Sequence, residues 1–183
     1  MTYASPISEL NATTMPLRPV ADGDAQDLFG LLSLCYAEYP GCYVDPHDDL
    51  PDLLAPSASY AATDGAFWVV EDGRGRVCAC VAVDFPEAGA AELHRLYVRP
   101  DQRGRGLGAM LVRQAESHAR SKGASRIVLW SDTRFTTAHR LYARWGYTQF
   151  DGQRELADIS KSAEYRFEKE LQLACLANSM KIA

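Results

Sequence analysis

The spacing of apolar residues changes along the chain and predicts where helices and strands form. Leu28, Leu32 and Cys35 recur at helical spacing within residues 25–39, and Pro40 follows them. The same period returns in two later segments, and a glycine directly follows each of them. The predicted helices are residues 25–39, 107–122 and 136–145, with a short one near 48–54.

Runs of alternating or continuous apolar residues predict strands between and after these helices. The predicted strands are residues 17–20, 66–71, 77–85, 91–98, 126–130, 147–150 and 165–171. Pro19 suits an edge strand, and the continuous run 126–130 suits a strand buried on both faces. The strand–helix–strand segment 91–130 predicts a parallel crossover, whereas the polar segment 151–162 predicts a loop. The fold class is therefore α/β (or α+β), with helices on the faces of a mixed sheet.

Composition fits one soluble globular domain. The 183 residues are 47% hydrophobic and 23% charged. We expect a domain over residues 16–172, between an irregular leader over 1–15 and a C-terminal tail over 173–183. No apolar stretch reaches the roughly 18 residues that span a bilayer, and the leader lacks the basic and apolar regions of a signal peptide. A cytoplasmic location is expected.

Net charge and cysteine spacing narrow the function classes. The net charge of −5 argues against a nucleic-acid-binding protein and against attachment to an anionic membrane. The five cysteines are irregularly spaced and have no His or Cys neighbours at metal-ligand spacing. They predict free buried thiols in a reducing compartment and no metal site.

A glycine-rich turn joins a predicted strand to a predicted helix at Arg103-Gly104-Arg105-Gly106-Leu107-Gly108. The first N–H groups of a helix lack partners and its N-terminal end is positive, so a phosphate can bind there where glycine removes the Cβ. The turn has neither the Gly-Lys-Ser/Thr of a Walker A loop nor the G-x-G-x-x-G spacing of a dinucleotide fingerprint. The turn alone indicates a diphosphate site or, as the plainer interpretation, a turn with solvated arginines.

Three motifs together resemble the GNAT N-acetyltransferase superfamily. Its Gln/Arg-x-x-Gly-x-Gly/Ala signature is matched by Arg103-x-x-Gly106-x-Gly108. Residues 92–100 are similar to the family's fourth strand, and residues 138–147 look like its late A-x-x-L-Y-x-x-x-G-F/Y element. The resemblance covers residues 17–171 and implies a GNAT fold: one twisted, mostly antiparallel sheet of about 6–7 strands with a splayed parallel pair at its centre.

The resemblance also implies acetyl-CoA as the co-substrate. Its pantetheine arm would lie between the splayed strands 91–98 and 126–130, and its diphosphate on the N–H groups of residues 103–109. The cofactor-binding residues that it implies are Leu96, Tyr97, Val98, Arg103, Gly104, Arg105, Gly106, Leu107, Gly108, Ala109, His139 and Tyr142. Many family members carry an asparagine where Phe135 stands, so that polar contact is lost or comes from His139 or Arg140.

The same resemblance implies catalytic roles. A lysine-like amine has a pKa of about 10.4 and arrives protonated, and Glu92 is the implied general base. Glu92 could instead pair with an arginine or order water, and His94 on the same strand face is the competing base. The implied oxyanion donor is the backbone N–H of Leu96, freed by a bulge. Tyr142 is the implied acid for the leaving thiolate, unless its ring only packs on the sheet.

The acceptor site is less defined. In this family it is built from the first helices, their connection and late loops, which here contain Tyr39, Tyr43 and acidic residues such as Asp48. Acidic groups suit a cationic amine, whereas Arg134, which follows Asp132, suits an acceptor with a carboxylate. The acceptor-binding residues that we expect are Tyr39, Tyr43, Glu92, Asp132 and Arg134.

These inferences predict an N-acetyltransferase. It would move an acetyl group from acetyl-CoA to a small amine, an amino acid or a protein amine, by direct attack in a ternary complex. Two alternatives stay open: a non-catalytic acyl-CoA-binding module, and an acyltransferase that uses a longer acyl donor or an oxygen acceptor. Many family members form dimers, so a homodimer is a further expectation.

Overall fold

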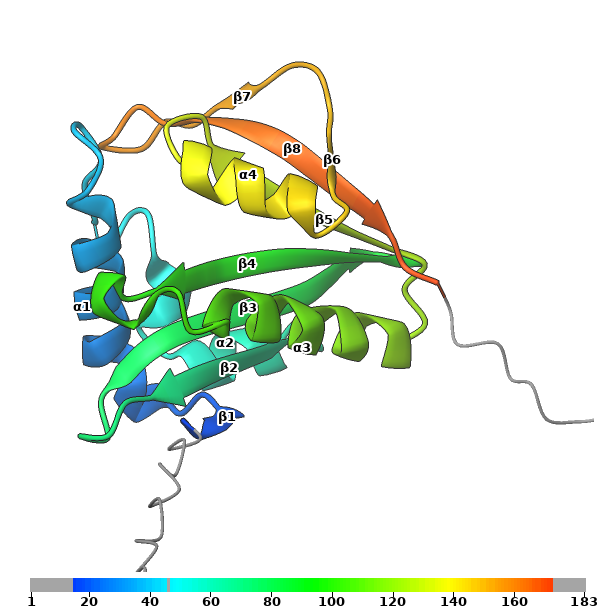
Figure 1. The fold of residues 1–183 in the computed structure, drawn as a ribbon. Helices are drawn as coiled ribbons and strands as arrows, with labels where there is room; N and C mark the ends of the chain where they lie inside the picture. Colours follow the sequence, from blue (N-terminus) through cyan, green and yellow to red (C-terminus); the bar gives the residue numbers. More distant parts are fainter. Residues whose placement is uncertain (1–14, 46, 173–183) are drawn as a thin grey trace, which may run out of the picture.

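One mixed sheet runs through the molecule in the order β1-β2-β3-β4-β5-β8-β6, with β7 also paired to β8. The computed structural model describes residues 15–45 and 47–172 (Figure 1). The strands are β1 Leu17–Pro19, β2 Ala66–Glu71, β3 Val77–Glu87, β4 Ala90–Val98, β5 Arg126–Asp132, β6 Thr148–Gln149, β7 Arg154–Glu155 and β8 Ala163–Glu170. Among the described strands only β4 and β5 pair in parallel, so the expected mixed, mostly antiparallel sheet is confirmed.

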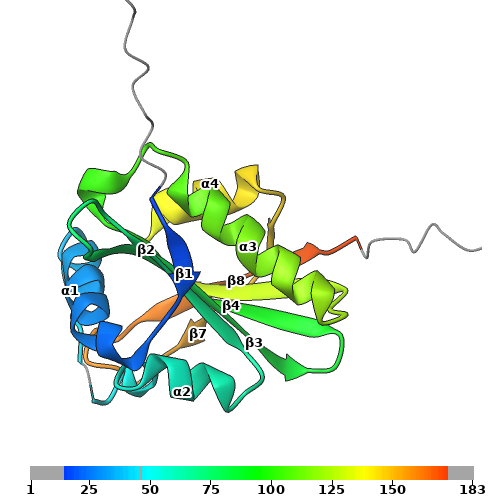
Figure 2. The ribbon, with the colours of Figure 1, turned by 90° about the horizontal axis from the view of Figure 1, so that it is seen from below.

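Helices cover both faces of this sheet (Figure 2). The helices α1 and α2 lie on one face, and α3 and α4 lie on the other. The α-helices are α1 Ala25–Tyr36, α2 Pro56–Ala61, α3 Leu107–Ser121 and α4 Thr136–Arg144. Short 3-10 turns, η1 Asp22–Asp24, η2 Pro51–Leu53 and η3 Pro100–Gln102, precede α1, α2 and the glycine-rich turn.

Each face of the sheet has its own hydrophobic core. Leu111 of α3 packs with Ile127 in the first core, and Leu28 of α1 packs with Val69 in the second. In β3, Val81 belongs to the first core and the next residue to the second, as expected for side chains that alternate across a strand. The first core holds α3 against β3 and β4, and the second holds α1 and α2 against β2 and β3.

The parallel pair of strands separates halfway along its length. β4 and β5 are paired from Ala90↔Arg126 to Leu93↔Leu129, and no further pair joins them within the described residues. Beyond that point β4 stays paired with β3 as far as Val98, whereas β5 stays paired with β8. The sheet therefore opens between residues 94–98 and 130–132, and the expected splay of the parallel pair is confirmed (Figure 1).

Three predicted elements differ from the structure. The helix predicted over residues 25–39 ends at Tyr36, because Pro40 has no N–H to donate to the carbonyl of Tyr36, which accepts from Tyr39 instead. The short helix expected near 48–54 is only the turn η2, and α2 was not predicted, although Pro56 stands in its first turn, where proline is favoured. The segment 151–162 contains β7, which raises the number of strands to eight.

Some expectations fall partly or wholly outside the described residues. The tail over 173–183 and all of the leader except Met15 lie there, as does Cys175. Cys35, Cys42, Cys78 and Cys80 are described, and all four are free and buried, as predicted. Within residues 15–45 and 47–172, no helix has the length and the apolar composition needed to cross a membrane.

Candidate active site

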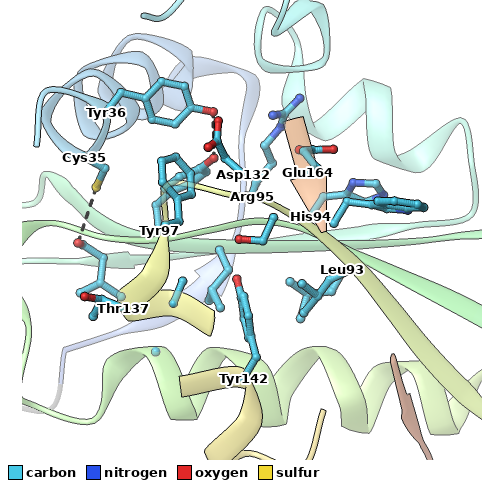
Figure 3. A pocket seen from close by; sticks show the side chains of 18 of the residues that line it. Cys35, Tyr36, Leu93, His94, Arg95, Tyr97, Asp132, Thr137, Tyr142 and Glu164 are labelled. Carbon is cyan, nitrogen blue, oxygen red and sulfur yellow. Dashed lines mark hydrogen bonds between the residues drawn. The ribbon is translucent and has the colours of Figure 1, made fainter. Parts of the chain in front are cut away.

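The opening between β4 and β5 continues as a cavity of about 890 Å³ (Figure 3). Its walls come from the end of α1, the connection that contains η2, the outer half of β4 and the end of β5. The glycine-rich turn, the start of α3, the inner side of α4 and the loop between β7 and β8 complete them. The sheet topology thus brings segments that are distant in the sequence around one space.

The strand β4 is bulged where it forms the cavity wall. Two steps along β3, from Cys80 to Ala82, correspond to three steps along β4, so β4 carries an extra residue. Arg95 at the bulge has a φ of +52°, a left-handed conformation that costs a non-glycine residue about 1–2 kcal/mol. The bulge adjoins Leu96, whose backbone N–H is the expected oxyanion donor.

The glycine-rich turn presents open backbone at the start of α3. Gly104 and Gly106 have φ values of +77° and +80°, and a Cβ at either position would meet no heavy atom within 4 Å. The first helical hydrogen bond runs from the N–H of Met110 to the carbonyl of Gly106 at 3.0 Å, and no side chain caps the helix. The N–H groups of residues 107–109 precede that bond, so they can donate to an anionic ligand.

The two arginines of the turn differ in their surroundings. Arg103 donates to the carbonyl of Val98 at 3.0 Å and to the carboxylate of Glu38 at 2.7 and 3.1 Å, which fastens the end of β4 to the segment after α1. Arg105 is exposed and does not belong to the cavity lining. The charge of Arg103 is therefore taken up by Glu38, and Arg103 offers a ligand mainly its backbone.

Three ionisable side chains meet on β4 and the neighbouring end of β3. His94 Nε2 lies 3.1 Å from Asp84 Oδ1 and 3.9 Å from Glu92 Oε1. Glu92 and His94 both line the cavity, with side chains that are 21% and 30% exposed. Both candidates for the general base therefore reach the cavity from the same strand face.

Tyr142 points from α4 into the cavity (Figure 3). The residue is 6% exposed, and its ring packs on those of Trp145 and Phe167. Burial raises the pKa of the Tyr142 hydroxyl far above its ordinary value. The hydroxyl therefore stays protonated at neutral pH and can donate a hydrogen bond to a ligand.

Phe135 belongs to an aromatic wall. Its ring centroid lies 5.7 Å from that of Tyr36 and 4.6 Å from that of Tyr39. Tyr36 continues the wall to Tyr97, with the two hydroxyl oxygens 3.1 Å apart. All four residues line the cavity. This wall supplies apolar contact for the carbon skeleton of a ligand, at the position where an asparagine would have supplied a polar one.

The pair Asp132–Arg134 clamps three loops together. Arg134 donates to Asp132 Oδ1 at 2.8 Å, to the carbonyl of Gly41 at 3.0 Å and to Ser162 Oγ at 3.1 Å. Burial alone would raise the pKa of Asp132, but the hydrogen bonds from Arg134 and its charge lower it. Asp132 lines the cavity and Arg134 does not. The guanidinium is occupied, so the expected contact of Arg134 with an acceptor carboxylate does not fit this arrangement.

His139 faces the sheet instead of the cavity. Its Nε2 lies 3.0 Å from the carbonyl oxygen of Asp132, and its ring packs against Tyr165 and Phe167. It does not belong to the cavity lining. The expected contact of His139 with the cofactor does not fit this arrangement either, because the sheet holds its ring away.

Several acidic side chains of the cavity have no basic partner. Asp48, Asp49 and Asp158 line it together. Burial, followed by the charges of Asp158, Asp45 and Asp48, raises the pKa of Asp49. In the part of the chain that the structure describes, no Lys or Arg forms a salt bridge with these three or with Glu92, and no cluster of His, Cys, Asp and Glu could hold a metal ion.

The arginines of the cavity, in contrast, are all paired. The pairs are Arg95–Asp52, Arg103–Glu38 and Arg154–Glu164, at 2.7, 2.7 and 2.8 Å. The carboxylates that lack a Lys or Arg partner therefore give the cavity an excess of negative charge. This charge complements a cationic ligand.

The structure brings most of the expected acceptor residues together and adds some that sequence reasoning missed. Tyr39, Tyr43, Glu92 and Asp132 line the cavity, as do residues 156–158 of the late loop. No motif marks that loop. It reaches the cavity because the Oγ of Ser160 accepts from the N–H of Tyr43 at 2.8 Å, which joins it to the connection after α1.

The sequence is similar to known acetyltransferases over the region that builds this site. The acetyltransferase (GNAT) family model matches residues 28–147. An N-acetyltransferase of Schizosaccharomyces pombe is 36% identical over 97 residues, which are 52% of this chain and 60% of that protein. The mycothiol acetyltransferase of Beutenbergia cavernae is 34% identical over 100 residues, which are 54% of this chain and 34% of that protein. The matches thus span about a third to three fifths of these relatives.

Solved structures share the fold over most of the chain. A GNAT-family acetyltransferase of Staphylococcus aureus Mu50 has a TM-score of 0.75 at 16% identity, over 87% of this chain and all of that one. The PaiA N-acetyltransferase of Thermoplasma acidophilum, solved in complex with coenzyme A, has a TM-score of 0.68 at 19% identity, over 86% of this chain and 99% of that one. These likenesses show the fold, and the family match covers the cavity's strands, turn and helices. The chain belongs to the GNAT acetyltransferase family.

Proposed function

We propose that the protein is an acetyl-CoA-dependent N-acetyltransferase that acetylates a cationic amine by direct attack in a ternary complex. The observation that carries the proposal is the cavity at the splayed pair β4–β5, where Glu92, Tyr142 and the open turn over residues 104–109 line one space. Membership of the GNAT family supports it, as does a structural neighbour solved with coenzyme A. A cytosolic setting, where thiols such as Cys35 stay reduced, belongs to the proposal.

In this proposal the backbone holds most of the cofactor. The N–H groups before the first helical bond of α3 take the diphosphate, aided by the helix dipole. Residues 96–98 have no β5 partner among the described residues, so the backbone groups of this edge that Arg103 does not occupy are open to the pantetheine arm. Arg105, exposed beside the turn, adds positive charge for the phosphates.

The reaction requires three groups beside the thioester. Glu92 takes the proton of the ammonium, directly or through water, and the amine nitrogen then attacks the acetyl carbon. The N–H of Leu96 at the bulge stabilises the oxyanion. As the new C–N bond forms and the C–S bond breaks, the nitrogen releases its second proton to water, Tyr142 gives its own proton to the leaving sulfur, and Tyr142 regains one from solvent.

The charge of the cavity selects the acceptor class. Glu92, Asp48, Asp49 and Asp158 favour an amine that carries positive charge. A carboxylate on the acceptor would meet these acids, while Arg134 is occupied by Asp132. We therefore propose a cationic amine, such as a diamine, as the acceptor, rather than an amino acid that binds through its carboxylate.

A matched acceptor series tests the charge assignment. An alkyl diamine, an alkyl monoamine and an ω-amino acid of equal chain length would be compared by kcat/KM with acetyl-CoA. We expect the diamine to be the best substrate and the ω-amino acid the poorest. The reverse order would contradict the proposed acceptor class. Binding of coenzyme A without turnover of any amine would favour the non-catalytic module.

A further inference from the structure

An ion pair joins Arg95, at the bulge of β4, to Asp52 in the turn η2. Arg95 donates through Nε to Asp52 Oδ2 at 3.0 Å and through Nη2 to Oδ1 at 2.7 Å. The hydroxyl of Tyr60 donates to the same carboxylate at 3.1 Å. The side chains of Arg95 and Asp52 are only 22% and 24% exposed, so water competes little for these bonds. The pair is a two-point connection between β4 and η2.

The backbone of Arg95 is tied as well. Its φ of +52° is a conformation that a non-glycine residue keeps only when its surroundings hold it. The thiol of Cys80 on β3 donates to the carbonyl oxygen of Arg95 at 3.0 Å. That carbonyl and the N–H of Leu96 belong to one rigid peptide plane. Whatever holds Arg95 therefore sets the direction in which the N–H of Leu96 points.

We propose that Arg95 is a positioning residue: its pair with Asp52, supported by Tyr60, holds the bulge so that the N–H of Leu96 faces the thioester carbonyl. This inference rests on the proposed function, because it requires an acyl-CoA in the cleft. It also couples two walls, since η2 belongs to the connection that carries Asp48 and Asp49. Asp52, in the same connection as these two acids, thereby helps to fix the N–H that would stabilise the oxyanion.

Substitutions of Arg95 and Asp52 separate positioning from direct contact with the acceptor. Asp52→Asn keeps a partner for Tyr60 but removes the charge, and we expect kcat to fall about 10- to 100-fold with the KM of the acceptor little changed. Arg95→Gly should retain more activity than Arg95→Ala, because glycine adopts a positive φ without strain. Arg95→Lys should rescue part of the loss. The control is Asp27→Asn, which breaks the pair with Arg76 outside the cavity.

A binding measurement gives a second readout that needs no turnover. The affinities for acetyl-CoA and for CoA are compared by calorimetry in the wild-type protein and in Asp52→Asn, with thermal unfolding to verify folding. We expect the wild type to prefer acetyl-CoA and Asp52→Asn to lose most of that preference. If the wild type acetylates no amine but this difference is found, the proposed function fails and the positioning role stands.

The positioning role is overturned by any of three results. The wild type and Asp52→Asn could show the same preference for acetyl-CoA over CoA, or no preference at all. Arg95→Gly could be no more active than Arg95→Ala. The effect of Asp52→Asn could be confined to the KM of the acceptor, which would make Arg95 a direct contact of the acceptor. If Arg95→Ala fails to fold, Asp52→Asn and Arg95→Gly decide the question.

Discussion

At the scale of single residues, burial separates the two groups that would move protons. Tyr142 is 6% exposed, and burial raises the pKa of its hydroxyl, so the hydroxyl reaches the reaction protonated, with a hydrogen bond to offer to the leaving sulfur. The side chain of Glu92 is 21% exposed and lies 3.9 Å from His94, so water can reach it. A buried proton donor on one wall and a solvent-accessible proton acceptor on another suit the proton transfers of an amide-forming reaction.

The role of Tyr142 is tested by removing one oxygen atom. Tyr142→Phe should lower kcat about 100-fold while the affinity for acetyl-CoA changes little, because the ring still packs on Phe167. Tyr147→Phe is the matched control, since its hydroxyl binds Glu116 outside the cavity. Steady-state kinetics of both variants give the answer, and equal rates in Tyr142→Phe and the wild type would remove Tyr142 from the mechanism.

The role of Glu92 is tested by the dependence of the rate on pH. Glu92→Gln should slow the reaction most at low pH, where the amine is almost fully protonated and needs a base. Glu87→Gln, in the exposed pair with Arg126 at the end of β3, is the control. The measurement is kcat/KM against pH for both variants. A loss of the same size at every pH would make Glu92 a structural residue.

At the scale of elements, the start of α3 depends on glycines that need a left-handed backbone. Gly106→Ala has room for its methyl group but strains a φ of +80° by about 1–2 kcal/mol. Its Cβ would also stand where the proposed diphosphate approaches. We expect the Kd for coenzyme A to rise at least about tenfold, measured by calorimetry. The control is Gly73→Ala, where a Cβ has open space and φ is not positive, and it should leave the Kd unchanged. If both substitutions change the Kd equally, coenzyme A does not bind at the start of α3.

We predict that the stability of the protein depends on pH through Asp72, in the turn between β2 and β3. Asp72 accepts from Arg99 and from the N–H groups of Arg74 and Arg76, which lowers its pKa to about 2. A lowered folded-state pKa stabilises the protein above about pH 4, and this contribution is lost as the pH falls toward about 2.

Urea unfolding at a series of pH values measures this contribution. The free energy of unfolding of Asp72→Asn should lie about 1–2 kcal/mol below that of the wild type at neutral pH, and the gap should close as the pH falls from about 4 to about 2. Exposed Asp151→Asn serves as the control. A gap that stays constant down to about pH 2 would show that the charge of Asp72 contributes nothing.

Elements with their own sequence pattern were predictable, and those that depend on a partner were not. The glycine-rich turn before α3 and the continuous apolar run of β5 are encoded locally, and both were expected within a few residues of their bounds. The strand β7 has only two residues and exists because β8 offers an edge beside it. Arg134 looked free in the sequence because Gly41 and Ser162, two of its partners, come from distant loops.

At the scale of the whole molecule, one part of the site follows from local sequence patterns and the other from contacts between distant segments. Most of the residues that the three motifs implied for the cofactor line the cavity, whereas Arg105 and His139 do not. The other part of the site arises from pairings between distant segments. Arg95 and Asp52 are 43 residues apart, and Ser160 and Tyr43 are 117 apart. No local pattern signals such contacts, because only the folded topology brings the partners together.

The most direct test of the account is the release of free thiol from acetyl-CoA, followed with and without an alkyl diamine, with the product identified by mass spectrometry. We expect thiol release that requires the diamine, yields an N-acetylated product in equal amount and falls about 100-fold in Tyr142→Phe. Binding of acetyl-CoA without thiol release above the amine-free rate, across the whole acceptor series, would contradict the account.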